Sequence, residues 1–303
     1  MEKLDVEKLK EVGNASVEAL NIAAQMIKPG AKLIDVAKAA EGHVAEKGFD
    51  FAFPINISIN GQAAHYTPSL NDELAFGEND IVKLDFGAAK DGLLGDVALT
   101  VSTASDNRHA SMLEATKEAL DEAISMVKAG ARVSDIGKAI SAKIEAKGFQ
   151  PIRNLGGHGV GVHNLHADIF IPNYDNGDDT ALDEGQLIAI EPFATLKNGK
   201  GIVVEGDAEE IFQFEQSANV RMENSRKLLK AIMEKYSTEP FAARWLGSVL
   251  NDRFALYSSL HDLMRAGAIS SYPVLVESSG AIVSQHEAEM VVGKDSCDVV
   301  AIV

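Results

Sequence analysis

The sequence predicts an α+β fold that contains an internal pseudo-twofold repeat and an inserted helical subdomain. Residues 26–49 align without a gap on residues 126–149, with ten of the 24 pairs identical, whereas unrelated segments share about one or two. Each copy is followed by an apolar run that ends near an acidic residue, Asp85 or Glu191. Only the second half carries further helical patterns, over residues 222–269.

Each half begins with a pair of helices. In the first copy, apolar residues at helical spacing occupy positions 9–27, and the pattern stops at Gly30. In the second copy the same pattern occupies positions 120–127 and stops at Gly130. A second helix follows each glycine, so we expect a repeated unit of helix, turn, helix and strand.

Each half then enters β structure around an acidic residue. Residues 76–88 and 182–194 share turn residues followed by an apolar run that reaches Asp85 and Glu191, at an offset of 106. In the first half, a turn rich in Gly and Lys returns the chain to Asp96. We therefore expect Asp85 and Asp96 to lie across a hairpin from each other.

The second half needs a matching partner for Glu191. Glu287 is the natural candidate, because it lies in the apolar segment 281–292 near the end of the chain. The two acids of the second half are separated by about 85 more residues than those of the first half. The helical patterns at 222–269 fill most of this insertion.

The composition describes a soluble globular protein. Hydrophobic residues make up 46% of the chain, and its pattern leads us to expect neither a signal peptide nor a segment that crosses a membrane. With 28 Lys and Arg against 45 Asp and Glu, the net charge of −17 argues against direct nucleic-acid binding. The single cysteine, Cys297, agrees with a reducing compartment. We expect a cytoplasmic protein without a membrane partner.

The duplication would bring four carboxylates to one axis, and these are Asp85, Asp96, Glu191 and Glu287. Burying four negative charges together is prohibitive without cations. Two divalent metal ions, bridged by carboxylates at about 3.5 to 4 Å, would neutralise the cluster. We therefore expect a dinuclear metal centre.

Histidines complete the candidate site. Glycines flank His158 in the segment 154–166, which suits a tight backbone path that holds an imidazole toward a crowded site as a metal ligand. His166 in the same segment and His65 in residues 62–68 are candidate acid/base or oxyanion groups.

These residues resemble the pita-bread metallopeptidases, and most closely the type II methionine aminopeptidases of the short, archaeal kind. The resemblance covers nearly the whole chain and rests on motifs in the family's order: AAHYTP, KLDFG, GDVALT, NLGGHGVG, AIEPFA and SQHEAE. It implies a pita-bread catalytic domain formed by residues 1–195 and 275–303. Residues 196–274 would then form the inserted, mainly helical subdomain that is characteristic of type II enzymes.

The resemblance also implies a site and a reaction. The metal ligands would be Asp85, Asp96, His158, Glu191 and Glu287, holding two divalent ions that could be Co, Mn, Fe or Zn. A water or hydroxide between the metals would attack the first peptide carbonyl, and Glu191 would take and return the proton. His166 would stabilise the oxyanion, and His65 would contact the scissile amide.

The implied substrate is the N-terminal peptide of a nascent protein whose second residue is small, with transient association with the ribosome. For the methionine side chain, motif position suggests an apolar pocket formed by Phe53, Leu165 and Tyr272.

Two other readings stay open. One is a peptidase like prolidase or aminopeptidase P, which shares the fold and ligand set, and the other is a non-catalytic pita-bread binding protein. The chain also departs from the family at the last motif. The family has Glu-His-Thr there, and this chain has Glu287-Ala288-Glu289, preceded by His286.

Overall fold

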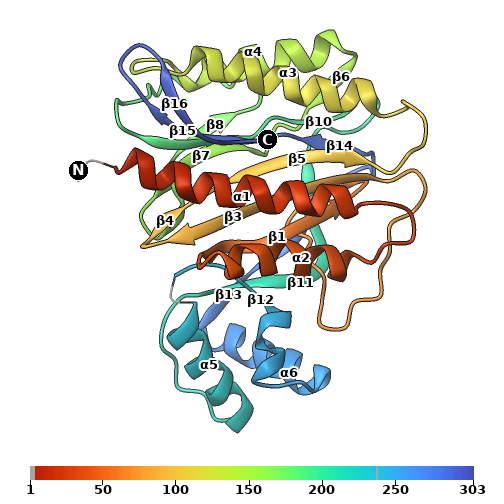
Figure 1. Cartoon of the computed structure of the whole chain (residues 1–303), viewed down its shortest axis with the longest axis vertical. Helices are drawn as coiled ribbons and strands as arrows, with labels where there is room; N and C mark the ends of the chain where they lie inside the picture. The colour runs from red at the N-terminus through yellow and green to blue at the C-terminus, as the bar shows by residue number, and fades with distance from the viewer. Residues whose placement is uncertain (1–3, 237) are drawn as a thin grey trace.

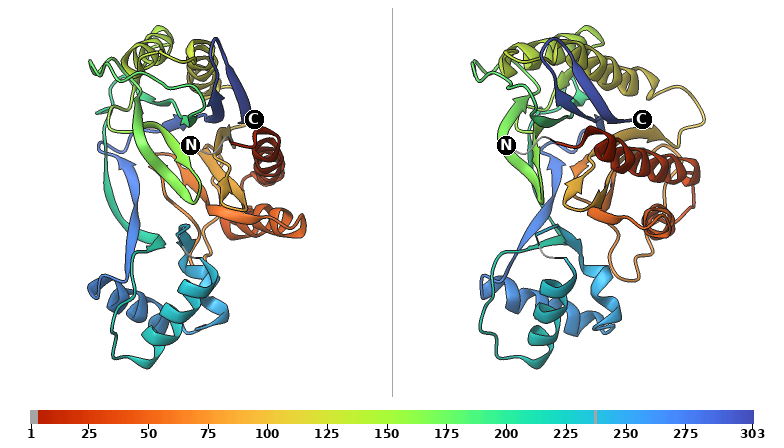
Figure 2. Two further views of the ribbon diagram at one scale, coloured as in Figure 1. Left: turned by 90° about the vertical axis from the view of Figure 1, so that its left-hand side faces the viewer. Right: turned by 60° about the vertical axis from the view of Figure 1, so that its left-hand side comes forward.

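The computed structural model describes residues 4–236 and 238–303. Two helix pairs, a set of small antiparallel sheets and a helical end make up the molecule (Figure 1). Helices α5 and α6 gather at one end, and α3 and α4 lie at the other (Figures 1 and 2). Within the described residues, no helix has the length and apolar character needed to cross a membrane.

The first half forms a four-stranded sheet covered by two helices. Its elements are α1 (Val6–Met26), α2 (Leu33–Glu46), β1 (Asp50–Ile59), β2 (Gln62–Ala64), β3 (Ile81–Lys90), β4 (Leu93–Leu94) and β5 (Val97–Ser102). Strand β3 pairs with β1, β4 and β5, while β2 joins another sheet. Apolar side chains of α1, α2, β1 and β3 form one continuous core.

The second half repeats the helix pair and adds two sheets. Its elements are α3 (Ala110–Met126), α4 (Val133–Ala146), β6 (Phe149–Pro151), β7 (Gly156–Gly161), β8 (Asn164–Pro172), β9 (Leu187–Ile190), β10 (Phe193–Leu196), β14 (Val283–Gln285), β15 (Ala288–Val292) and β16 (Cys297–Ile302). The strand orders are β16-β15-β9-β7-β8 and β14-β10-β6. A second core forms between α3, α4 and the larger sheet.

The structure confirms the repeat in its backbone. Gly30 and Gly130 both have φ of 82°, a left-handed conformation that glycine adopts without steric cost. Their amides donate to Phe76 and Leu182, each over 2.8 Å. These two acceptors are separated by the offset of 106 that relates the two acidic strands, so the helix pairs and the sheets follow one duplication.

Between the two acids of the second half lies a segment with its own core. It comprises β11 (Val203–Phe214), α5 (Glu223–Lys235), β12 (Phe241–Ala242), the 3₁₀ helix η1 (Ala243–Ser248), α6 (Arg253–Arg265) and β13 (Ile269–Glu277). The strand order is β12-β11-β13-β2, so a strand of the first half completes this sheet. The interval 196–274 thus contains the expected helices together with β11 and most of β13.

Candidate active site

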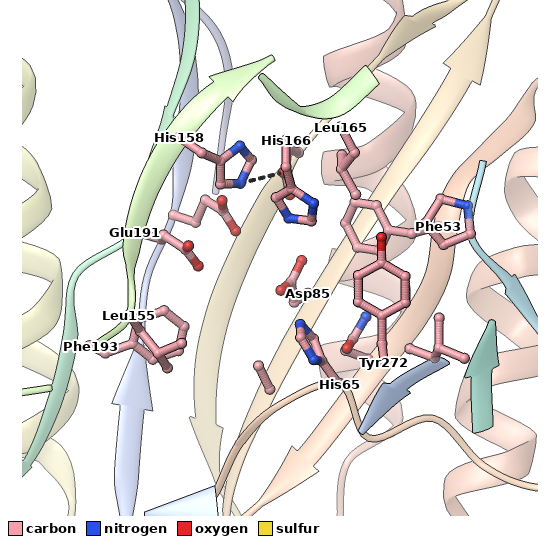
Figure 3. Close-up of a pocket in the computed structure, with 16 residues that line it drawn as sticks. Phe53, His65, Asp85, Leu155, His158, Leu165, His166, Glu191, Phe193 and Tyr272 are labelled. Atoms are coloured by element: carbon pink, nitrogen blue, oxygen red, sulfur yellow. Dashed lines mark ion pairs between the residues drawn. The ribbon is translucent and has the colours of Figure 1, made fainter. Parts of the chain in front are cut away.

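One pocket is lined by all ten residues that the sequence indicated as candidate site residues. They are Phe53, His65, Asp85, Asp96, His158, Leu165, His166, Glu191, Tyr272 and Glu287 (Figure 3). Asn56, Ala64, Leu155, Phe193, Ile211 and Pro240 complete the lining. Residues from both halves and from the inserted segment therefore meet at one place.

The acidic residues reach the pocket from equivalent places in the two halves. Asp85 lies within β3, and Asp96 directly precedes β5, which pairs with β3 in the expected hairpin. Glu191 directly follows β9, and Glu287 directly precedes β15, which pairs with β9. The two hairpins are joined because the amide of Glu287 donates to the carbonyl of Ala98 over 2.9 Å.

His158 occupies β7, where the surrounding glycines permit close backbone packing. A Cβ at Gly157 would lie 2.2 Å from the carbonyl oxygen of Ala189, so a larger residue could not fit. The His158 Nδ1–H donates to the carbonyl of Gly159 over 3.0 Å, which leaves Nε2 facing Asp96 Oδ2 at 3.4 Å. Burial lowers the pKa of His158 to about 4, so the ring is neutral and can offer a lone pair to a metal ion.

Burial and the nearness of other carboxyl groups disfavour the charged forms of the four acidic side chains. Asp96 and Glu287 are buried, and burial together with the neighbouring carboxylates raises the pKa of both well above the ordinary range. Burial also raises the pKa of Glu191 well above its usual value and that of Asp85 to about 7. Negative charges held this close need positive partners.

The free ligand atoms fit divalent cations. Asp96, His158 and Glu287 each offer an atom within 4.8 Å of the others. Asp85 Oδ1 and Glu287 Oε2 are buried without any hydrogen-bond partner. Because buried polar atoms are almost always paired, these orphaned oxygens indicate sites for cations. The set of four carboxylates and one imidazole suits ions that prefer oxygen and nitrogen ligands.

Gln285 is a site residue that the sequence analysis missed. Its Nε2 donates to Asp85 Oδ2 over 3.4 Å and to Glu191 Oε2 over 3.2 Å, so one amide links a carboxylate from each half. The backbone N–H of Gln285 donates to Oγ1 of Thr100, on β5, over 2.8 Å, and this bond fixes the position of the Gln285 backbone. The available signal was its position two residues before Glu287, since alternate strand residues share a face.

Glu289 is a second residue near the site whose burial the sequence did not indicate. It stands on β15 opposite Ala189, fully buried, and neither carboxylate oxygen has a hydrogen-bond partner. Burial raises its pKa well above the ordinary range. The departure from the family's last motif therefore adds a fifth buried carboxyl group behind the cluster.

The two candidate catalytic histidines face the cluster from different elements. His65 lies in a left-handed conformation, with φ of 66°, after β2, and its Nδ1–H donates to the carbonyl of Pro273 over 3.2 Å. Burial lowers the pKa of His65 to about 4, so its Nε2 is an acceptor. His166 on β8 lies edge-on to His158 with ring centroids 4.6 Å apart. Tyr272 lies beside both histidines, with its ring centroid 5.5 Å from that of His65 and 6.4 Å from that of His166 (Figure 3).

Comparison with known proteins gives a consistent result. The profile of metallopeptidase family M24 matches residues 7–225. The methionine aminopeptidase of Archaeoglobus fulgidus is 46% identical over 286 residues, covering 94% of each chain. That of Pyrococcus horikoshii is 42% identical and covers 98% of this chain and 99% of its own.

Solved structures agree at the level of the fold. A thermophilic Arx1 has a TM-score of 0.84 at 19% identity, covering 98% of this chain and 90% of that one. A methionine aminopeptidase from Thermotoga maritima has a TM-score of 0.71 at 24% identity, covering 99% and 97%. These likenesses confirm the expected fold.

Proposed function

Because the chain belongs to metallopeptidase family M24, we propose that it removes the N-terminal methionine from nascent proteins whose second residue is small. The observation that carries this proposal is the pocket itself. Five side chains suited to metal ions, two histidines and an apolar wall converge there from distant parts of the chain. Curated relatives with near-complete coverage carry the same name, methionine aminopeptidase.

The family uses divalent metal, and we assign the ligands to Asp85, Asp96, His158, Glu191 and Glu287. Four carboxylates match the charge of two dications, which supports a dinuclear centre with Co, Mn, Fe or Zn. When bound, the ions would supply the Lewis acidity that activates water for amide hydrolysis. The orphaned oxygens of Asp85 and Glu287 support this assignment.

The remaining steps fall to side chains of the pocket. Glu191, oriented by Gln285, would take a proton from the attacking water and return it to the departing amine. His65 presents an acceptor nitrogen, which suits the N–H of the scissile amide. His166 would donate to the oxygen on which negative charge develops.

The apolar part of the pocket would bind the methionine side chain. Phe53, Leu165 and Tyr272 are our candidates, and Leu155 and Phe193 lie in the same lining (Figure 3). An unbranched thioether fits an irregular apolar pocket well. A narrow site would exclude large second residues, because misplacing the reacting carbonyl by about 1 Å can cost a hundredfold in rate.

We assign residues 1–195 and 275–303 to the catalytic domain and 196–274 to an inserted subdomain. We further propose that the protein acts in the cytoplasm, in transient association with the ribosome, where nascent N-termini emerge. A thermophilic Arx1 and a prolidase have the same fold. The proposed activity therefore rests on the site and on the sequence relatives, and not on the fold.

Peptides varied only in their first two residues test the proposal. Metal-loaded protein should cleave Met-Ala and Met-Gly peptides and leave Met-Glu and Met-Leu peptides intact, with values of kcat/KM that differ by orders of magnitude. Preference for proline as the second residue, with indifference to the first, would favour the prolidase-like reading. Failure to bind any divalent metal would favour the non-catalytic binding protein.

A further inference from the structure

Asn56 is a polar pocket residue that no step of the proposed reaction uses. It lies on β1, is only 4% exposed and forms part of the pocket lining. A buried amide in such a place requires partners for both its donor and its acceptor.

Only one end of the Asn56 amide has a partner. Nδ2 donates to the carbonyl of Pro54 over 2.9 Å, and Oδ1 is buried with no hydrogen-bond partner. Exchanging the two ends would bring two oxygens together at Pro54, so the observed orientation is the favourable one. The side chain of this lining residue is therefore held with an unpaired acceptor, and leaving a buried acceptor unpaired is costly.

The position of this acceptor restricts what it can bind. Asn56 stands directly opposite Asp85 in the β1–β3 register, and such pairs have Cβ atoms about 4.5 to 5.5 Å apart. A group that reaches Asn56 Oδ1 therefore lies beside Asp85, one of the carboxylates of the acidic cluster. Unlike the carboxylates, the neutral amide oxygen adds no charge to balance a metal ion, so it suits a ligand that carries N–H or O–H donors.

We propose that Asn56 Oδ1 accepts a hydrogen bond from the free α-amino group of the substrate's first residue. This assignment rests on the proposed function. A methionyl peptide offers two N–H groups near its scissile bond, the α-amine and the scissile amide, and His65 is placed to accept from the amide. The thioether has no hydrogen to donate. Asn56 thus recognises a free N-terminus, which separates an aminopeptidase substrate from a blocked or internal residue.

Two product-like ligands isolate the amine. L-methionine and 4-(methylthio)butanoate differ only in the amino group, and their dissociation constants can be measured by calorimetry on the metal-loaded protein. Asn56→Leu keeps the side-chain shape, and we expect it to raise the dissociation constant of L-methionine by about fivefold to thirtyfold. Binding of 4-(methylthio)butanoate should change by less than twofold.

Two further variants control for charge and folding. Asn56→Asp still presents an oxygen and should retain the preference for L-methionine. Asn173→Leu is the matched control, because Asn173 is also buried, donates from Nδ2 to a backbone carbonyl and has an unpaired Oδ1, but does not line the pocket. It should leave the ratio of the two dissociation constants unchanged.

The outcomes are distinguishable. Equal weakening of both ligands by Asn56→Leu, no change in either, or loss of the preference in Asn56→Asp would overturn the amine assignment while leaving the peptidase intact. If the unmodified, metal-loaded protein bound neither ligand and cleaved no methionyl peptide, the proposed function would fall, and this assignment with it.

Discussion

Arg244 and Glu41, 203 residues apart in the chain, form an ion pair buried between the inserted segment and the first half of the molecule. Arg244 also donates to Thr67 Oγ1 over 2.6 Å and to the carbonyl of Pro68 over 3.1 Å. Thr67 and Pro68 lie two and three residues after His65 in the chain. The inserted segment therefore holds in place the loop that carries a candidate catalytic histidine.

Replacing Arg244 alone should be costly. Arg244→Met leaves the Glu41 carboxylate buried without its partner, and breaking a buried ion pair typically lowers the free energy of unfolding by about 3 to 5 kcal/mol. The double variant with Glu41→Met should lose less, because no charge remains unpaired. Urea unfolding of the three proteins measures the difference. Equal losses in the single and double variants would show that the pair is not the source of the effect.

Removing one carboxylate charge from the cluster should weaken metal binding. We expect Glu287→Gln or Asp96→Asn to reduce the bound metal per chain and to abolish most activity, since each charge helps to balance a dication. Elemental analysis after dialysis gives the metal content. Asp168→Asn, an exposed carboxylate on β8, is the matched control and should retain both. Normal turnover by protein from which a chelator has removed the metal would contradict the metal assignment.

His166→Ala should act on the chemical step. A donor to the developing oxyanion contributes mainly in the transition state, so we expect kcat to fall about a hundredfold or more with little change in KM. His163→Ala is the control from the same hairpin, because His163 is exposed and pairs with Glu239 over 2.6 Å. A change confined to KM would reassign His166 to ground-state binding.

Glu210 should make stability depend on pH. Burial raises the pKa of its carboxyl to about 7 in the folded protein, although the Tyr257 hydroxyl donates to it over 2.5 Å. The unfolded value is about 4.3, so the folded state binds the extra proton between these values and loses stability as pH rises through them. Glu210→Gln, which cannot ionise, should therefore gain about 1 to 3 kcal/mol over the unmodified protein between pH 4.5 and pH 8.

Unfolding in urea at the two pH values tests this. Glu209→Gln, at the preceding position on β11, is the control. A constant difference between Glu210→Gln and the unmodified protein across this range would show that the carboxyl of Glu210 does not titrate differently in the two states.

Much of the fold and the candidate site could be predicted because the relevant signals are local or repeated. Gly30 and Gly130 adopt the same left-handed conformation in the turns that follow two equivalent helices, and a glycine shortly after an apolar stripe indicates such a turn. Asp85 and Asp96 are joined by one short hairpin. Glu287 could be placed beside Glu191 because the duplication requires a returning strand there.

The sequence by itself determined which residues were expected to meet in one site and how the two halves correspond, since period, turn residues and duplication are readable along the chain. Only the tertiary structure decided that Gln285 links Asp85 to Glu191, that Arg244 holds the His65 loop and that Asn56 keeps a free acceptor. Most of these contacts join residues that are far apart in sequence. They leave no local pattern, because their energy depends on burial and hydrogen-bond geometry that exist only once the chain is packed.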